Sequence, residues 1–119
     1  MHVLICDDEP DIRMLFRHAF EDLGVEVSEA TDGNECIIAA TRDHPDIIVL
    51  DLFMPHRDGL AALPDIRKGS PESAVLVVSA HAAVDVFDTA RARGATACFD
   101  KLAFLPRIPA LIERYGPAA

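Results

Sequence analysis

The acidic residues that follow two apolar runs are the first candidates for chemistry. In the stretch "HVLICDDEP", the apolar run ends directly at Asp7 and Asp8, and Asp51 follows the apolar run Ile47–Leu50 in the same way. Neighbouring carboxylates repel one another unless a cation neutralises them. Oxygen ligands without a histidine or cysteine cluster are typical of Mg²⁺ or Mn²⁺ rather than zinc. The pattern therefore predicts a magnesium or manganese site formed by Asp7, Asp8 and Asp51.

Two further polar residues end apolar runs in the second half of the chain. Ser79 closes the run Ala74–Ser79, and Lys101 follows "ACFD". A metal ion, an ammonium group and a hydroxyl group together can hold the oxygens of a phosphoryl group. A carboxylate is a competent nucleophile toward phosphorus and gives an aspartyl phosphate. We therefore predict that Asp51 accepts a phosphoryl group and that Lys101 and Ser79 bind it.

The elements that would position these residues are five short apolar runs that alternate with helical patterns. Such continuous runs, rich in valine and isoleucine, are typical of parallel strands buried on both faces. The alternation predicts an α/β protein with a doubly wound sheet and right-handed crossovers. Chemistry in such sheets gathers at the carboxyl ends of the strands, where the polar residues fall. The predicted strands are His2–Cys6, Val25–Ala30, Ile47–Leu50, Ala74–Ser79 and Ala97–Phe99.

Five helices are predicted between and after these strands. Asp58 suits the N-cap of the third helix, and Gly24 suits the end of the first. Pro64 lies inside the third helix and is expected to kink or loosen it. Pro106 and Pro109 fit the first turn of a last helix that begins at about Leu105 or Pro106. The predicted helices are Pro10–Leu23, Asn34–Arg42, Gly59–Lys68, Ala82–Arg93 and one within Leu105–Tyr115.

Composition limits the possible functions. The 119 residues fit one domain, residues 1–119, and the formal net charge of −9 argues against direct binding of nucleic acid or anionic membranes. Cys6, Cys36 and Cys98 form no CxxC pair, so we expect them to be reduced packing residues. No apolar run has the length of a membrane span, and the N-terminus has no signal-peptide pattern. The expected location is the cytoplasm.

Four motifs in order carry a family resemblance: "CDDEP", "DLFMPHRDG", "VVSA" and "GATACFDK". Together they resemble the receiver domain of response regulators in two-component signalling, of the chemotaxis-regulator kind, over almost the whole chain. The resemblance implies a flavodoxin-like (βα)5 fold with a parallel five-stranded sheet in the order 2-1-3-4-5. It implies a signalling switch rather than an enzyme, one that assists only its own phosphorylation and dephosphorylation.

The resemblance also implies a role for each site residue. Asp51 matches the phosphoacceptor, Asp8 a direct Mg²⁺ ligand, and Asp7 a ligand that acts mainly through water. Phe53 would offer its backbone carbonyl to the metal. Ser79 matches the switch residue that bonds the phosphoryl group, and Lys101 matches the lysine that pairs with it. Met54-Pro55 and Gly59 match the following loop and helix start.

The implied partners are a phosphoryl donor and an output protein. The donor would be a phosphohistidine on a histidine kinase or a histidine phosphotransfer protein. The sequence does not identify the output partner, and no nucleic-acid contact or membrane insertion is expected. The protein would be a monomer or a phosphorylation-dependent dimer, as a stand-alone receiver or as part of a larger regulator.

Two positions depart from the family pattern. Cys98 stands where a switching tyrosine or phenylalanine is usual, and Phe99 is no substitute because neighbouring strand residues point to opposite faces. Leu102 replaces a proline that usually follows a cis bond, so another loop shape is expected after Lys101. Phe53 and His81 lie where they could affect the lifetime of the phosphoryl group.

Three other functions are alternatives to a phosphorylated receiver. A phosphatase of the haloacid dehalogenase type needs a second acid two residues after the nucleophile, where this chain has Phe53. A flavodoxin-like cofactor binder needs a loop rich in Ser, Thr and Gly after the first strand, and here that loop is acidic. The third alternative is a receiver-like interaction module that works without phosphorylation.

Overall fold

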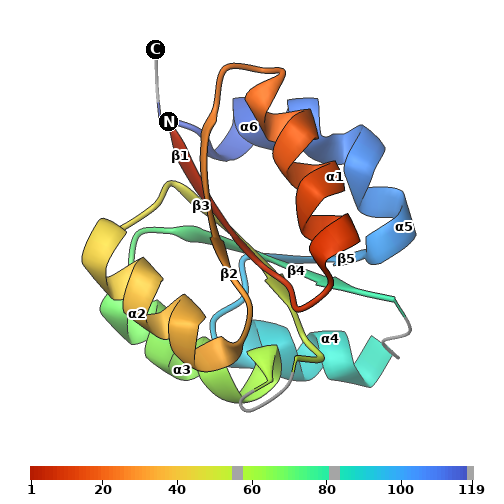
Figure 1. Cartoon of the computed structure of the whole chain (residues 1–119). Helices are drawn as coiled ribbons and strands as arrows, with labels where there is room; N and C mark the ends of the chain where they lie inside the picture. Colours follow the sequence, from red (N-terminus) through yellow and green to blue (C-terminus); the bar gives the residue numbers. More distant parts are fainter. Residues whose placement is uncertain (55–57, 81–83, 118–119) are drawn as a thin grey trace.

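The protein folds as a parallel β-sheet between two layers of helices, as Figure 1 shows for the computed structural model. The structure describes residues 1–54, 58–80 and 84–117. The order β2-β1-β3-β4-β5, with all neighbouring strands parallel, confirms the predicted doubly wound fold. The strands are β1 (His2–Cys6), β2 (Glu26–Ala30), β3 (Ile47–Asp51), β4 (Ala74–Ser79) and β5 (Ala97–Asp100).

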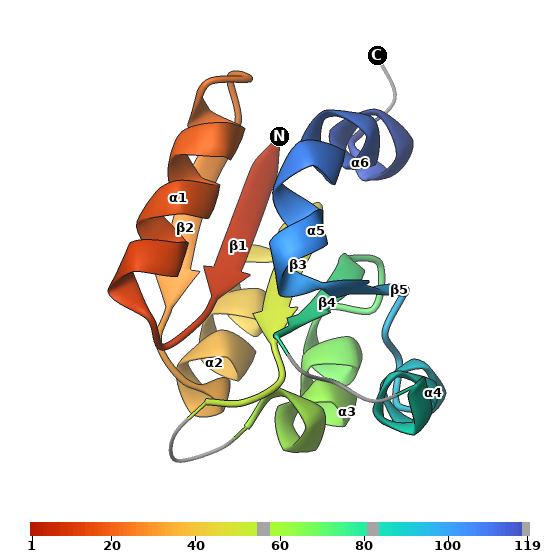
Figure 2. The same ribbon diagram turned by 90° about the vertical axis from the view of Figure 1, so that its right-hand side faces the viewer.

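Each face of the sheet is covered by its own set of helices (Figures 1 and 2). Successive residues of the central strand β1 alternate between two apolar cores: Val3 packs on one side and Leu4 on the other. The Val3 side is covered by α1 (Pro10–Glu21), α5 (Lys101–Phe104) and α6 (Ile108–Tyr115). The Leu4 side is covered by α2 (Gly33–Asp43), α3 (Gly59–Gly69) and α4 (Val84–Ala92).

Helix α3 continues through its internal proline. Pro64 has no N–H to donate to the carbonyl of Leu60, one turn earlier. The guanidinium of Arg93 donates to this carbonyl oxygen instead, at 3.1 Å. The predicted N-cap is confirmed, because the Asp58 side chain accepts a hydrogen bond from the Ala61 amide at 2.7 Å. A partner from another element thus compensates for the proline.

The last helical segment begins earlier than predicted. The last helix itself, α6, spans Ile108–Tyr115 and lies within the predicted range, but the short helix α5 before it, which begins at Lys101 directly after β5, is not predicted. The cause is Asp100, whose side chain accepts a hydrogen bond from the Leu102 amide at 2.9 Å and caps α5. Pro106 lies in the 3₁₀ turn η1 (Leu105–Arg107), which joins α5 to α6. The described residues contain no cis peptide bond, in line with leucine rather than proline at position 102.

The prediction for the cysteines is wrong for two of the three. Cys6 and Cys36 are joined by a disulfide, with their Cα atoms 6.0 Å apart, and only Cys98 is free. The two residues are far apart in the sequence, but α2 packs on β1 and brings them together within one core. Spacing along the chain could not reveal a pair that depends on this packing.

Some predicted features lie outside the described residues. They are Pro55 in the loop after β3, His81 near the predicted phosphoryl site, and Ala82 at the predicted start of the fourth helix. Within the described ranges, no helix combines the length and the apolar character needed to cross a bilayer.

Candidate functional site

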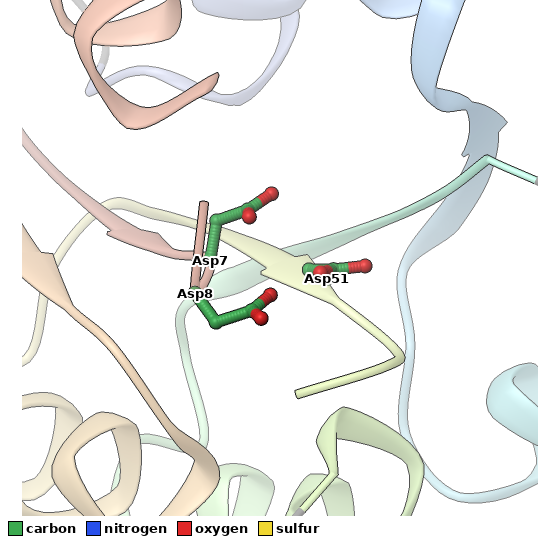
Figure 3. Close-up of side chains that lie close together, drawn as sticks. All are labelled: Asp7, Asp8 and Asp51. Carbon is green, nitrogen blue, oxygen red and sulfur yellow. The ribbon is translucent and has the colours of Figure 1, made fainter. Parts of the chain in front are cut away.

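Three carboxylates meet at the carboxyl ends of β1 and β3. One oxygen each from Asp7, Asp8 and Asp51 lies within 4.8 Å of the others. Figure 3 shows the three side chains projecting to the same side of the strand ends. Asp7 and Asp51 are almost fully buried, with 1% and 4% of their surface exposed, whereas Asp8 is exposed. The donor set fits a small, hard divalent cation that reaches the site from solvent.

Lys101 supplies positive charge from the opposite end of the chain. Only 7% of its surface is exposed. Its Nζ lies 2.7 Å from Asp7 Oδ2, 3.5 Å from Asp51 Oδ2 and 3.3 Å from Glu9 Oε1. The structure thus brings the predicted lysine to the predicted acids. A buried ammonium is tolerated here because several carboxylates surround it.

Burial and mutual repulsion set the charge state of the acids. Burial, and then the neighbouring Asp7 charge, raise the pKa of Asp51 to about 6, against the opposing effect of Lys101. Burial also raises the pKa of Asp7. Burial alone would lower the pKa of Lys101, but the hydrogen bond from Lys101 to Asp7 and the Asp51 charge raise it overall. A bound divalent cation would relieve the same repulsion and favour ionised carboxylates.

Ser79 provides a hydroxyl at the end of the neighbouring strand. In the register of β3 and β4, Asp51 lies opposite Val78, so Ser79 is one position beyond it. The Ser79 side chain is 1% exposed, and its Oγ has no hydrogen-bond partner among the described residues. A buried hydroxyl without a partner is costly and implies that a ligand or another state satisfies it.

Two residues around the site were not anticipated from the sequence. The Glu9 amide donates to Asp7 Oδ1 at 2.9 Å, and its side chain contacts Lys101. Arg13 donates from Nη1 to the Asp7 carbonyl oxygen at 2.7 Å and pairs with Glu29 on β2. Together these contacts fix the end of β1. A local signal for these contacts is the spacing of Glu9 and Arg13, which lie one helical turn apart.

Phe53 is placed beside the acids, but its predicted role is untested. Its amide lies 3.4 Å from Asp51 Oδ1, and its side chain is 60% exposed. Backbone carbonyl coordination of a metal by Phe53 stays a prediction.

Cys98 and Phe99 point to opposite faces of the sheet, as predicted. Cys98 packs with the core beneath α2, α3 and α4, and its Sγ lies 3.8 Å from the Phe87 carbonyl oxygen. Phe99 belongs to the other core, with its ring centroid 5.5 Å from that of Phe104. Phe99 therefore cannot take the place of the missing aromatic residue at position 98.

Gly59 is required by the close approach of α3 to the end of β3. Its amide donates to the Leu52 carbonyl oxygen at 2.8 Å, and a Cβ at this position would overlap the Asp51 carbonyl oxygen. We expect Gly59→Ala to lower the free energy of unfolding by about 2 kcal/mol or more. Helix propensity alone predicts that alanine raises the free energy of unfolding relative to glycine. Urea unfolding followed by circular dichroism measures the difference, and a more stable Gly59→Ala protein would contradict the steric explanation.

The fold and this cluster define a family. Residues 3–113 match the response regulator receiver domain. The chain belongs to this family and is a receiver domain, the phosphorylation-controlled switch of two-component signalling.

Similar proteins include small receivers of comparable length. Sporulation initiation phosphotransferase F of Bacillus subtilis (strain 168) is 26% identical over 115 residues, which cover 97% of this chain and 93% of that protein. The chemotaxis protein CheY4 of Vibrio cholerae superposes with a TM-score of 0.86 at 26% identity, and the superposition covers 96% of this chain and 97% of CheY4. A chain of the CheX-CheY-BeF3-Mg²⁺ complex of Borrelia burgdorferi superposes with a TM-score of 0.82 at 25% identity. The superposition covers 94% of this chain and 89% of that chain.

Other relatives are considerably longer than this chain. The chain spans 24% to 35% of the length of a protein-glutamate methylesterase, a probable transcriptional regulator and a DNA-binding transcriptional regulator that it matches. The activities of those whole proteins are therefore not transferred to it.

Proposed function

We propose that Asp51 accepts a phosphoryl group from a phosphohistidine and that this modification switches a protein-binding surface. The donor would be a histidine kinase or a histidine phosphotransfer protein. The observation that carries the proposal is the buried cluster of Asp51, Asp7 and Lys101 beside the unpartnered hydroxyl of Ser79. On the resemblance alone, we also place the protein in the cytoplasm.

The chain's own residues account for the transfer. An oxygen of Asp51 forms a bond to phosphorus while the bond from phosphorus to the donor imidazole nitrogen breaks, and the imidazole leaves. Lys101 then exchanges a carboxylate for a phosphoryl oxygen, and the Ser79 hydroxyl donates to another phosphoryl oxygen. Mg²⁺, held by Asp7, Asp8 and Asp51 with the Phe53 carbonyl, would neutralise charge on the transferring group.

The switch follows from the contacts that Ser79 and Lys101 lose or gain on phosphorylation. Ser79 ends β4, and Lys101 lies at the junction of β5 and α5. Their movement toward a new charge of about −1.5 to −2 would displace both strand ends. The alternative, a module that works without phosphorylation, is not favoured because all three acids of the cluster are present and two of them, Asp7 and Asp51, are buried.

Intact-mass spectrometry after incubation with Mg²⁺ and acetyl phosphate tests the proposal. We expect one phosphoryl adduct on the wild type and none on Asp51→Asn or in the presence of EDTA. Asp58→Asn is the matched control, because it makes the same chemical change at a helix cap outside the cluster. This control is expected to retain the adduct.

A missing adduct on the wild type has two explanations that a second measurement separates. Beryllofluoride with Mg²⁺ mimics the phosphorylated state without hydrolysis. If it shifts the amide resonances of Asp51 and Ser79, the adduct forms and hydrolyses quickly. If neither reagent has an effect, phosphorylation is not the function of this site.

A further inference from the structure

A disulfide lies directly beside the acidic cluster. Cys6 ends β1, and the next two residues in the chain are the proposed metal ligands Asp7 and Asp8. Its partner Cys36 lies on α2, 30 residues later. Both cysteine side chains are completely buried in the same apolar core. The bond therefore ties the end of the strand that carries the acids to a helix on one face of the sheet.

The end of β1 is held differently from the two faces of the sheet. Figure 1 shows α1 and α5 on one face and α2 on the other. On the α1 and α5 face, Arg13 donates to the Asp7 carbonyl oxygen and Lys101 to the Asp7 carboxylate, each at 2.7 Å. On the α2 face, the Cys6–Cys36 bond holds the preceding residue covalently. Breaking this bond removes the covalent restraint and gives the backbone at the acids more freedom.

The start of α2 is also connected to the acids through the main chain. The Asp7 amide donates to the Ala30 carbonyl oxygen at 3.1 Å, at the end of β2. Two residues later, the Asp32 side chain caps α2 by accepting a hydrogen bond from the Glu35 amide at 2.9 Å. A movement of the first turn of α2 is therefore passed to Asp7 through Ala30 as well as through Cys6.

Reduction of the disulfide needs room that the oxidised core does not provide. Two thiols that are not bonded lie farther apart than two bonded sulfurs, and each gains a hydrogen atom. Because protein cores are close-packed, this additional volume shifts neighbouring elements. β1 is paired with β2 on one side and β3 on the other, whereas Asn34 and Glu35 in the first turn of α2 are exposed. The first turn of α2 is therefore the part that moves.

The proposed location of the protein bears on the role of this bond. Lasting disulfides are rare in the cytoplasm, and those that form there are mostly catalytic or redox-sensing. The third cysteine, Cys98, is free and packs against the same core, so it does not take part in the bond. A disulfide that adjoins two acids of a metal site is placed to sense redox conditions and to act on that site.

We propose that Cys6 and Cys36 form a reversible redox site that controls metal binding by the acidic cluster. In the oxidised state the disulfide keeps Asp7 and Asp8 oriented for Mg²⁺, which accepts little deviation from its preferred coordination geometry. In the reduced state the same ligands are less well oriented, so their affinity for Mg²⁺ is lower. Phosphorylation of Asp51 would therefore be slower under reducing conditions. This control rests on the metal site of the proposed function.

The reductant is a dithiol, either a protein dithiol or a small molecule. One of its thiolates attacks the Cys36 sulfur, because the first turn of α2 can open locally, whereas Cys6 lies in an inner strand. The disulfide bond breaks, and the Cys6 sulfur leaves as a thiolate that takes up a proton. The second thiolate of the reductant displaces the Cys36 sulfur, which is also protonated, and the reductant becomes a disulfide. Two electrons and two protons have then passed to the protein.

An NMR titration of the Asp8 amide with Mg²⁺, on the full chain with and without dithiothreitol, tests the proposal. We expect a Kd about tenfold higher for the reduced protein, as is typical of changes next to metal ligands. Cys36→Ala should raise the Kd by a similar factor with or without dithiothreitol. The matched control Cys98→Ala should keep the Kd within about twofold of the wild type and should retain the response to dithiothreitol.

Thermodynamic linkage supplies a second readout that does not depend on phosphorylation. If the disulfide strengthens Mg²⁺ binding, Mg²⁺ must stabilise the disulfide by the same factor. In mixtures of reduced and oxidised dithiothreitol, saturating Mg²⁺ should raise the ratio needed for half reduction about tenfold. Alkylation of the denatured protein, followed by intact-mass spectrometry, counts one free thiol in the oxidised state and three in the reduced state. In Asp8→Asn, the ratio should not respond to Mg²⁺.

Several results would overturn the proposal. They are an equal Kd in the two redox states, absence of Mg²⁺ binding in both, and half reduction at the same ratio with and without Mg²⁺. Loss of the folded state on reduction, seen in the amide spectrum, would overturn it as well, because a switch requires two folded states. An adduct on Asp51 without a redox effect leaves the proposed function intact, whereas a redox effect without an adduct contradicts that function alone.

Discussion

The Asp51→Asn protein is expected to be more stable than the wild type in metal-free solution at about pH 8, by about 2 kcal/mol in free energy of unfolding. Burial and the Asp7 charge raise the pKa of Asp51 from its ordinary 3.8 to about 6. At pH 8 the wild type therefore keeps an ionised carboxylate in an unfavourable place. Asparagine has the same shape without the charge. The loss of the Asp51–Lys101 ion pair, at 3.5 Å, reduces the gain.

The raised pKa of Asp51 also predicts how the free energy of unfolding changes with pH. Between about pH 4 and pH 6 the folded state keeps a proton on Asp51 that the unfolded state has lost. Stability contributed by this group is therefore present at low pH and is lost as the pH rises through about 6. Urea unfolding with EDTA at several pH values should show the variant's advantage growing from near zero at about pH 4. An advantage of equal size at every pH would rule out this cause.

Replacing Lys101 with methionine is expected to have the opposite and larger effect, a loss of about 3 kcal/mol at about pH 8 without metal. The change leaves Asp7 and Asp51 buried without the ammonium that lies 2.7 Å and 3.5 Å from them. Below about pH 5 the loss should shrink, because protonation neutralises the acids. Methionine keeps most of the apolar stem of lysine, so lost packing contributes little.

A matched lysine and a double variant separate charge from packing. Lys68 is exposed on α3, and Lys68→Met should change the free energy of unfolding by less than about 0.5 kcal/mol. In the presence of Asp51→Asn, the cost of Lys101→Met should fall, since one of the two acids is already neutral. Equal losses for Lys68→Met and Lys101→Met, or strict additivity with Asp51→Asn, would argue against an electrostatic role.

The strands and the acidic cluster could be predicted because their signals are local. An apolar run that ends in Asp7 or Asp51 shows both the strand and the place where its side chains gather. Lys101 and Ser79 are also predictable by position, since Ser79 ends β4 and Lys101 directly follows β5. The roles of these residues rest on the family resemblance and on the experiments proposed above.

Features that depend on packing between elements could not be predicted. The Cys6–Cys36 bond requires α2 to lie on β1, and the Arg93 contact that compensates for Pro64 comes from beyond α4. The short helix α5 could not be predicted because Pro106 and Pro109 indicate a helix start near Leu105, whereas the Asp100 side chain caps a helix that begins at Lys101.

The position of Lys101 has a consequence for the order of folding during synthesis. Lys101 lies 92 residues after Glu9, whose side chain it contacts at the start of α1. A nascent chain that has emerged only through β4 can bring Asp7 and Asp51 together but lacks the ammonium that offsets their charge. The central strands therefore gain full stability only when the last strand joins them. While the final strand is still in the exit tunnel, ribosome-bound intermediates should accordingly be less compact at about pH 8 than at about pH 5, because protonation of Asp51 at the lower pH reduces the repulsion.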